Sequence, residues 1–130
     1  MPAADQPACR LAICDDVEAF RRLLSIVFEL EPDIEVVGQA GDGQEAIDLV
    51  ASTPVDVLLL DLAMPTMDGL EALPKLRAAS PDTRVIMLTG FGTREIRERA
   101  LAAGADRYLE KGIMPDEILA AIRDVHSVAS

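Results

Sequence analysis

Short apolar runs alternate with amphipathic stretches along the whole chain. The apolar runs lie at residues 9–14, 34–40, 55–61, 84–89 and 106–110, and polar or turn-forming residues bound each of them. Runs of this length are typical of buried β-strands. The 55–61 run is the most apolar, which favours a place in the middle of a sheet that is covered on both faces.

The stretches between these runs carry apolar residues three and four positions apart, the spacing of one helix face. They predict helices at about 17–31, 44–51, 69–79, 93–103 and 115–126. Pro74 falls inside the third of these and is expected to kink it, and Gly104 suits a left-handed cap after the fourth. Strict alternation of strand and helix predicts a doubly wound α/β fold, in which a five-stranded parallel sheet carries five helices on its two faces.

Four of the predicted strands lead directly into residues that can handle a phosphoryl group. These residues are Asp15 and Asp16 after the first strand, Asp61 at the end of the third, Thr89 at the end of the fourth and Lys111 after the fifth. Ligands bind beyond the carboxyl ends of the strands in open parallel α/β sheets. With the strand order 2-1-3-4-5, the first and third strands are neighbours, so these side chains converge on one crevice.

The three carboxylates predict a metal-assisted phosphoryl site. Carboxylates held close together repel one another, and a divalent cation relieves that repulsion. Mg²⁺ suits such a site, because it prefers oxygen ligands and keeps several waters. Asp61 is in the position of a nucleophile, whose attack on phosphorus would give an aspartyl phosphate. Mg²⁺, the Lys111 ammonium and the Thr89 hydroxyl would then stabilise the charge on the phosphoryl oxygens.

The composition narrows the class of protein without changing this picture. The 130 residues fit one domain, which we expect at 9–128 after a disordered segment at 1–8. The net charge of −11 argues against direct nucleic-acid binding by this chain, because such binding needs a basic face. We see no signal peptide and no apolar stretch near the roughly 18 residues of a membrane span, so we expect no membrane contact and a cytoplasmic location.

The thiols and the imidazole of the chain are expected to lie outside this chemistry. Cys9 and Cys14 are five residues apart in one predicted strand, so their side chains point to opposite faces and cannot easily pair. We interpret both as buried free thiols. The single histidine, His126, falls on the last predicted helix, far from the crevice, and is therefore not a candidate for a phosphohistidine relay.

Four segments together resemble the receiver domain of two-component response regulators. They are ICDD at 13–16, LDLAMPTMDG at 60–69, MLTG at 87–90 and GADRYLEK at 104–111. The pattern Asp-x-x-Met-Pro-x-Met-Asp-Gly after an apolar strand is highly specific, and the resemblance runs from about residue 10 to 125. It implies a flavodoxin-like fold like that of the chemotaxis regulators.

The resemblance assigns roles to the residues of the crevice. Asp61 would be the phosphoacceptor, and Lys111 would pair with the phosphoryl group. Asp15 and Asp16 would hold Mg²⁺ together with Asp61, and the backbone carbonyl of Ala63 would be a further ligand. The phosphodonor would be a phosphohistidine on a sensor histidine kinase or a histidine phosphotransfer protein, and the domain itself would catalyse the transfer and its own dephosphorylation.

The resemblance also implies a switch. Thr89 would move toward the phosphoryl group and Tyr108 would swing inward behind it, which would change the face made by the fourth helix, fifth strand and fifth helix. That face is where we expect a partner or a homodimer contact. Ala63 and Phe91 occupy the two positions that flank the approach of water, and because neither can orient water, we expect slow autodephosphorylation.

Two alternatives belong to other functional classes. A haloacid-dehalogenase-like phosphatase also uses an aspartate at a strand end with Mg²⁺, but it needs a second aspartate two positions later, where this chain has Ala63. A non-phosphorylated interaction module typically loses an acidic or lysine position, whereas this chain keeps all of them. Whether the chain is a stand-alone regulator or the receiver of a longer transcriptional regulator stays open, as do its kinase and its output.

Overall fold

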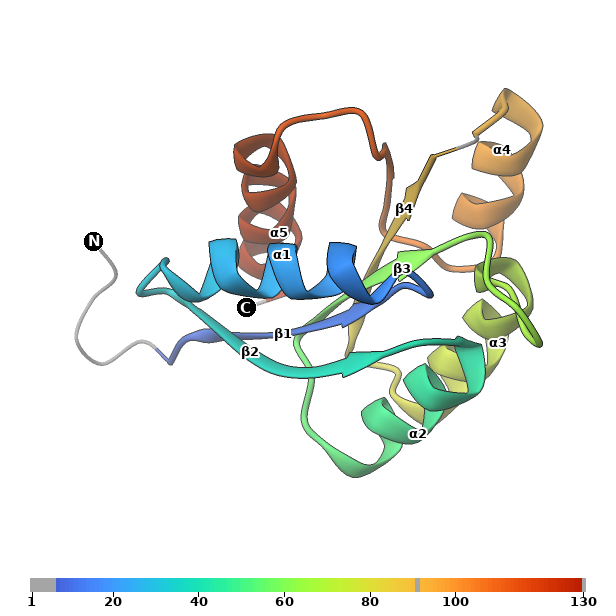
Figure 1. Ribbon diagram of the computed structural model, residues 1–130. Coiled ribbons are helices and arrows are strands. Elements are labelled where there is room, and N and C mark those ends of the chain that lie inside the picture. The colour runs from blue at the N-terminus through green and yellow to red at the C-terminus, as the bar shows by residue number, and fades with distance from the viewer. Residues whose placement is uncertain (1–6, 91, 130) are drawn as a thin grey trace.

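The computed structural model describes residues 7–90 and 92–129, which form a parallel sheet between two layers of helices (Figure 1). The strands are β1 (Cys9–Cys14), β2 (Ile34–Ala40), β3 (Val57–Asp61), β4 (Arg84–Thr89) and β5 (Arg107–Glu110). The helices are α1 (Glu18–Glu29), α2 (Gly43–Ser52), α3 (Gly69–Ala79), α4 (Arg94–Ala102) and α5 (Pro115–Ala129). The sheet order is β2-β1-β3-β4-β5 and every pairing is parallel, which confirms the predicted doubly wound fold.

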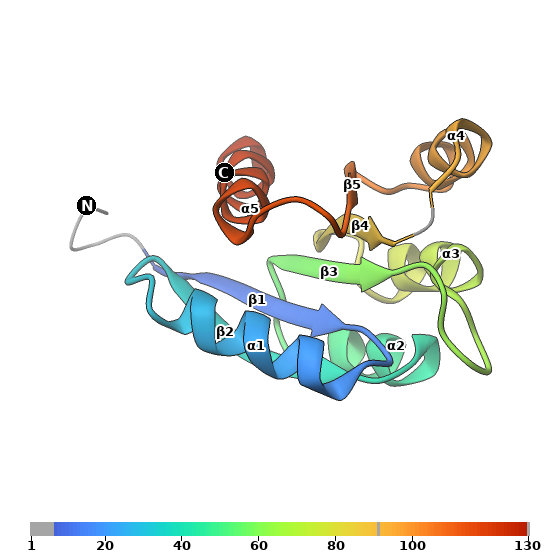
Figure 2. The same cartoon turned by 45° about the horizontal axis from the view of Figure 1, so that its top comes forward.

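The two faces of the sheet carry different helices, as Figure 2 shows. Helices α1 and α5 pack on one face, where Phe28 and Ile122 are fully buried. Helices α2, α3 and α4 cover the other face, where Leu73 and Ala100 are fully buried. All five residues of β3 are buried because this strand has helices on both sides.

The cysteines follow the alternation of β1 as predicted. Cys9 belongs to the core under α1 and α5, Cys14 belongs to the core under α2, α3 and α4, and both thiols are free and buried. Side chains five residues apart in a strand point to opposite faces, so the sheet itself separates them.

A few element ends differ from the sequence prediction. Strand β3 begins at Val57 rather than at residue 55, although the backbone of Asp56 still exchanges hydrogen bonds with Arg10 and Arg84. The carboxylate of Asp56 also accepts hydrogen bonds from the backbone N–H and guanidinium of Arg10. Helix α5 continues to Ala129 rather than ending near residue 126, since no glycine or proline interrupts it. Pro74 lies inside α3 and Gly104 has a φ of +115°, as expected.

The predicted disordered segment at 1–8 lies mostly outside the described residues and stays a prediction. Residues 7 and 8 precede β1 without regular structure. The first strand of the described chain begins at Cys9, and the predicted domain bounds of 9–128 stay a prediction.

Candidate functional site

The carboxyl end of β1 places Asp15 in the centre of the crevice. Its side chain is 2% exposed, and one carboxylate oxygen accepts a hydrogen bond of 2.8 Å from the backbone N–H of Val17 at the start of α1. The backbone carbonyl of Asp15 accepts a hydrogen bond of 2.5 Å from the guanidinium of Arg21 on the same helix. Asp15 is therefore held from both its side chain and its backbone.

Asp61 lies beside Asp15, because β1 and β3 are paired in register up to Cys14 and Leu60. The Asp61 side chain is 4% exposed. Asp15, Asp16 and Asp61 each present a carboxylate oxygen within 4.8 Å of the other two. The structure thus brings together the three acids that the sequence predicted, and leaves Asp16 exposed at the mouth of the site.

Lys111 brings a positive charge to these carboxylates from the other side. The backbone N–H of Lys111 donates to the carbonyl of Thr89, which fixes the loop after β5 against the end of β4. The Lys111 Nζ lies 2.6 Å from Asp15 Oδ2 and 3.4 Å from Asp61 Oδ1. It also lies 4.9 Å from the centre of the Phe20 ring, within the range of a cation–π contact.

Burial and charge shift the titration of these groups. Burial, together with the nearby Asp15 carboxylate, raises the pKa of Asp61 to about 6, although Lys111 lowers it. Burial lowers the pKa of Lys111, but its ion pairs with Asp15 and Asp61 raise the pKa above its ordinary value. The site therefore holds a permanently charged ammonium and a carboxylate that costs free energy to ionise, so added positive charge is favourable there.

The raised pKa of Asp61 predicts a pH-dependent stability. Folded Asp61 binds its proton up to about pH 6, above the ordinary pKa of 3.8, so its own contribution to stability should fall as the pH rises from about 4 to 6. Asp61→Asn should remove this cost and raise the free energy of unfolding at pH 7 by roughly 1–3 kcal/mol in metal-free buffer. Urea denaturation of both proteins across this range measures the difference, which should vanish near pH 4.

Asp68→Asn is the matched control for this measurement. Asp68 ends the loop that connects β3 to α3, and it caps α3 by accepting a 2.8 Å hydrogen bond from the backbone N–H of Glu71. Asparagine caps helices about as well as aspartate, so the control should change stability little at any pH. The stability difference between Asp61→Asn and the wild type should grow between pH 4 and 6. A difference that shrinks over this range, or an Asp61→Asn variant that is less stable at pH 7, would contradict the prediction.

Thr89 and Tyr108 occupy the positions expected of them. Thr89 ends β4 and is 1% exposed. Tyr108 is half-buried in β5, and its ring packs so closely on Gly92 that a Cβ at this glycine would lie 2.9 Å from the ring atom Cζ. The hydroxyl of Tyr108 is buried and, within the part of the chain that the structure describes, has no hydrogen-bond partner. Their movement on phosphorylation stays a prediction.

Ala63 lies on the open side of the site, whereas Phe91 is outside the described residues. Ala63 is exposed and lines a cavity of about 550 Å³ together with Asp16 and residues of α4, among them Ile96 and Arg99. Asp16 is the one of the three acids that lines this cavity. The predicted influence of Ala63 and Phe91 on water remains untested.

Sequence reasoning missed three residues that shape this site. Arg21 and Phe20 contact the site from the first turns of α1, as described above, and their only signal was their spacing after Asp15 and Asp16. Gly69 belongs to the recognised motif, but its role became visible only in the structure. A Cβ there would overlap the backbone carbonyl of Asp61 and lie 3.2 Å from the Cα of Leu62, so glycine lets α3 pack directly against the end of β3.

None of the helices within residues 7–90 and 92–129 has the length and apolar character needed to cross a membrane.

Comparison with known proteins supports the same interpretation as the site. The family model "Response regulator receiver domain" matches residues 11–123. An uncharacterized transcriptional regulatory protein of Bacillus subtilis, YhcZ, is 40% identical over 117 residues, which cover 90% of this chain and 54% of that protein. The chain thus spans about half the length of the curated transcriptional regulators it matches.

Solved structures share the fold over nearly the whole chain. The signal receiver domain of the putative response regulator NarL from Mycobacterium tuberculosis has a TM-score of 0.88 and 32% identity, with 94% of this chain and 98% of that chain covered. A response regulator from Burkholderia pseudomallei, crystallised with a phosphorylated aspartic acid, a calcium ion and citrate, has a TM-score of 0.81 and 30% identity, with 91% and 68% covered. With its family match, its five-stranded topology and its acidic crevice, this chain belongs to the response regulator receiver domain family.

Proposed function

We propose that this receiver domain accepts a phosphoryl group on Asp61 from a phosphohistidine of a sensor kinase or phosphotransfer protein. The observation that carries the proposal is the position of the Asp61 carboxylate, which lies between two other carboxylates and the Lys111 ammonium at the carboxyl end of a central strand. A buried carboxylate with a nearby cation and an open cavity is equipped to attack phosphorus. Non-phosphorylated modules of this fold have no need of such an arrangement.

The transfer exchanges one bond to phosphorus for another. A carboxylate oxygen of Asp61 attacks the phosphorus, the P–N bond to the donor histidine breaks, and the departing imidazole keeps the electron pair and takes a proton. The Lys111 ammonium would pair with the phosphoryl oxygens as negative charge moves to them from the carboxylate. The Thr89 hydroxyl would donate a hydrogen bond to one of these oxygens. Charge stabilisation and positioning supply most of the catalysis in such reactions.

The acidic crevice fits a magnesium ion. Three carboxylates lie within 4.8 Å of one another, and Lys111 is the one ammonium beside them among residues 7–90 and 92–129. Burial also makes the ionised form of Asp61 costly. Asp15, Asp16 and Asp61, with the backbone carbonyl of Ala63, would hold the ion as oxygen ligands. When bound, Mg²⁺ supplies positive charge next to the phosphoryl oxygens.

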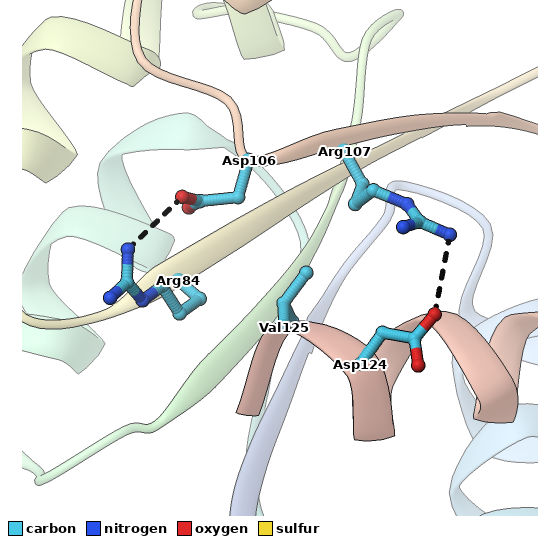
Figure 3. Close-up of a pocket in the computed structure, with 5 residues that line it drawn as sticks. All are labelled: Arg84, Asp106, Arg107, Asp124 and Val125. Carbon is cyan, nitrogen blue, oxygen red and sulfur yellow. Dashed lines mark hydrogen bonds and ion pairs between the residues drawn. The ribbon is translucent and has the colours of Figure 1, made fainter. Parts of the chain in front are cut away.

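The switch would reach the face formed by α4, β5 and α5. A phosphoryl group adds about −1.5 to −2 charges, which can draw Thr89 toward it and release Tyr108 into a second position. Figure 3 shows the ion pairs Arg107–Asp124 and Arg84–Asp106 beside a pocket in the β5–α5 part of this face. The volume of this pocket is about 200 Å³. A homodimer or partner contact here would be polar, because these four charged side chains could form ion pairs with the partner in place of their present ones.

The output and location of the whole protein are further proposals. The relatives that the chain matches include transcriptional regulators twice its length, so we propose that the phosphorylated domain controls an activity of an attached domain or a binding partner in the cytoplasm. These comparisons do not support the expectation that nucleic acid is never contacted, which rests on the net charge of −11 alone.

The outer face of α1 is suited to docking the phosphodonor. Large apolar side chains that are between 50% and 77% exposed gather here: Val17, Leu23, Ile26 and Leu30. Val17 adjoins Asp16, so the apolar face begins at the mouth of the site. Exposed apolar patches of this kind mark protein contacts, and spacing by three and four residues suits a helical partner.

Polar substitutions on α1 should therefore slow phosphorylation by a histidine kinase but not phosphorylation by the small molecule acetyl phosphate. Leu23→Gln combined with Ile26→Gln should slow transfer from a histidine kinase that phosphorylates the wild type by roughly tenfold. Phosphorylation by acetyl phosphate should not change, because neither side chain touches the crevice. Leu101→Gln, at an exposed leucine on α4, is the control. An equal loss with both donors would contradict docking on this face.

Slow loss of the phosphoryl group is expected from the position of Ala63. A methyl group cannot orient a water molecule, whereas Ala63→Asn places an amide beside Asp16 and should shorten the phosphorylated lifetime roughly two- to tenfold. Intact mass recorded over time after donor removal measures the decay, and Ala63→Val is the control without a hydrogen-bonding group. Wild-type decay as fast as that of chemotaxis regulators at the same Mg²⁺ concentration would contradict the expectation.

Intact mass spectrometry after incubation with acetyl phosphate tests the proposed function. A single phosphoryl adduct that forms with Mg²⁺, fails to form with a chelator, and maps to the peptide containing Asp61 is the expected result. No adduct despite demonstrable Mg²⁺ binding would favour a constitutive interaction module instead.

A further inference from the structure

A second cluster of metal-binding side chains lies at the opposite end of the sheet from the phosphoryl site. Cys9 begins β1, Asp56 immediately precedes β3, and His126 lies near the end of α5. The amino ends of parallel strands lie together just as their carboxyl ends do, so residues 47 and 70 positions apart in the sequence become neighbours. Six residues of β1 separate this cluster from Asp15, a distance of about 20 Å.

The three donor atoms are close enough to share one ion. The thiol sulfur, a carboxylate oxygen and an imidazole nitrogen all lie within 4.8 Å of one another, and His126 Nε2 is 4.0 Å from Asp56 Oδ2. Three atoms no more than 4.8 Å apart have a common point at most about 2.8 Å from each, which is 4.8 Å divided by √3. Zinc bonds are about 2.3 Å to sulfur and 2.0–2.2 Å to nitrogen or oxygen, so shifts well under 1 Å would complete the contacts.

Neighbouring residues hold the carboxylate in place. Asp56 accepts hydrogen bonds from the backbone N–H of Arg10 at 2.8 Å and from its guanidinium at 3.0 and 2.9 Å. Carboxylates that bind metals are commonly fixed by such outer partners. Cys9 is 3% exposed, whereas the side chains of Asp56 and His126 are 24% and 35% exposed and leave a side open to solvent.

We propose that Cys9, Asp56 and His126 form a Zn²⁺ site with water as the fourth ligand. A thiolate, an imidazole and a carboxylate are the donors that zinc selects, and magnesium does not use the first two. On binding, the Cys9 thiol loses its proton to solvent and the sulfur–zinc bond replaces the S–H bond. The ion joins β1, the segment before β3 and α5, and it stabilises the fold independently of phosphorylation.

Cobalt titration tests this site, because cobalt substitutes for zinc and its bond to a thiolate gives a charge-transfer band in the near ultraviolet. We expect one equivalent of Co²⁺ to produce the band in the reduced wild-type chain, and one equivalent of Zn²⁺ to abolish it. Cys9→Ser should lose the band entirely, and His126→Gln should weaken binding by roughly tenfold or more. Cys14→Ser is the matched control, since Cys14 is equally buried on the other face of the sheet.

The acidic crevice also attracts divalent cations, so the titration is repeated with Asp16→Asn and Asp61→Asn combined. The band should remain, because carboxylates give no thiolate absorption. Zn²⁺ should raise the Tm of this double variant, and much less when His126→Gln is added to it, which provides a second readout that does not depend on thiolate absorption. Absence of the band in the wild type, its survival in Cys9→Ser, or its loss in Cys14→Ser would each overturn the proposal.

Discussion

Asp61→Asn should yield no phosphoryl adduct under conditions in which the wild type is fully modified. The amide has almost the shape of the carboxylate but lacks its negative charge and its nucleophilic oxygen, so no bond to phosphorus forms. The fold and packing should be unchanged, because an amide of almost the same size replaces the buried Asp61 carboxylate. Intact mass after incubation with acetyl phosphate and Mg²⁺ measures the result directly.

Asp68→Asn is the control for this experiment too, since it makes the same chemical change seven residues later, at the end of the loop that connects β3 to α3. Its adduct should form as in the wild type, because the Asp68 side chain caps α3 and asparagine can do the same. If the adduct formed in Asp61→Asn as fast as in the wild type, the acceptor would be another residue. Asp15 and Asp16 would then be the next carboxylates to test. Loss of the adduct in both variants would mean that the loop, and not the nucleophile, had been damaged.

The sequence was most informative where a buried apolar run stops abruptly. The bounds of β1, β2 and β4 agree with their predicted ranges, because charged residues, glycine or proline flank each run. The start of β3 was predicted two residues too early, because Val55 is apolar and buried and so extends the hydrophobic pattern beyond the strand. The ion pair between Asp56 and Arg10, 46 positions apart, cannot be predicted from the local pattern.

The same limit applies to the sites. The convergence of the three acids and Lys111 could be predicted because parallel strands align their carboxyl ends, so position in the chain fixes position in space. The contacts of Arg21 and Phe20 depend on the direction in which their side chains point from α1. The spacing of residues along the sequence does not predict that direction. His126 lies away from the phosphoryl site, in agreement with the prediction, but its proximity to Cys9 depends on how α5 lies across the sheet.

Lys111→Met should slow phosphorylation by roughly 10²–10³-fold while leaving Mg²⁺ binding in place, because removal of one charged stabilising group from a preorganised site has effects of this size. The Lys111 ammonium contacts both Asp15 and Asp61, at 2.6 and 3.4 Å, so no other described residue can replace it between them. Methionine keeps the unbranched stem and can still pack on Phe20. Initial rates of adduct formation at saturating Mg²⁺ measure the loss.

The only other lysine in the sequence provides the control for this prediction. Lys75 is exposed on α3, so Lys75→Met makes the same substitution without touching the crevice and should leave the rate unchanged. A loss of less than about threefold in Lys111→Met would mean that metal and backbone dipoles supply nearly all the charge stabilisation. The ammonium would then serve only to favour the ionised form of Asp61 before the phosphoryl group arrives, and the pKa of Asp61 in the variant should lie above about 6.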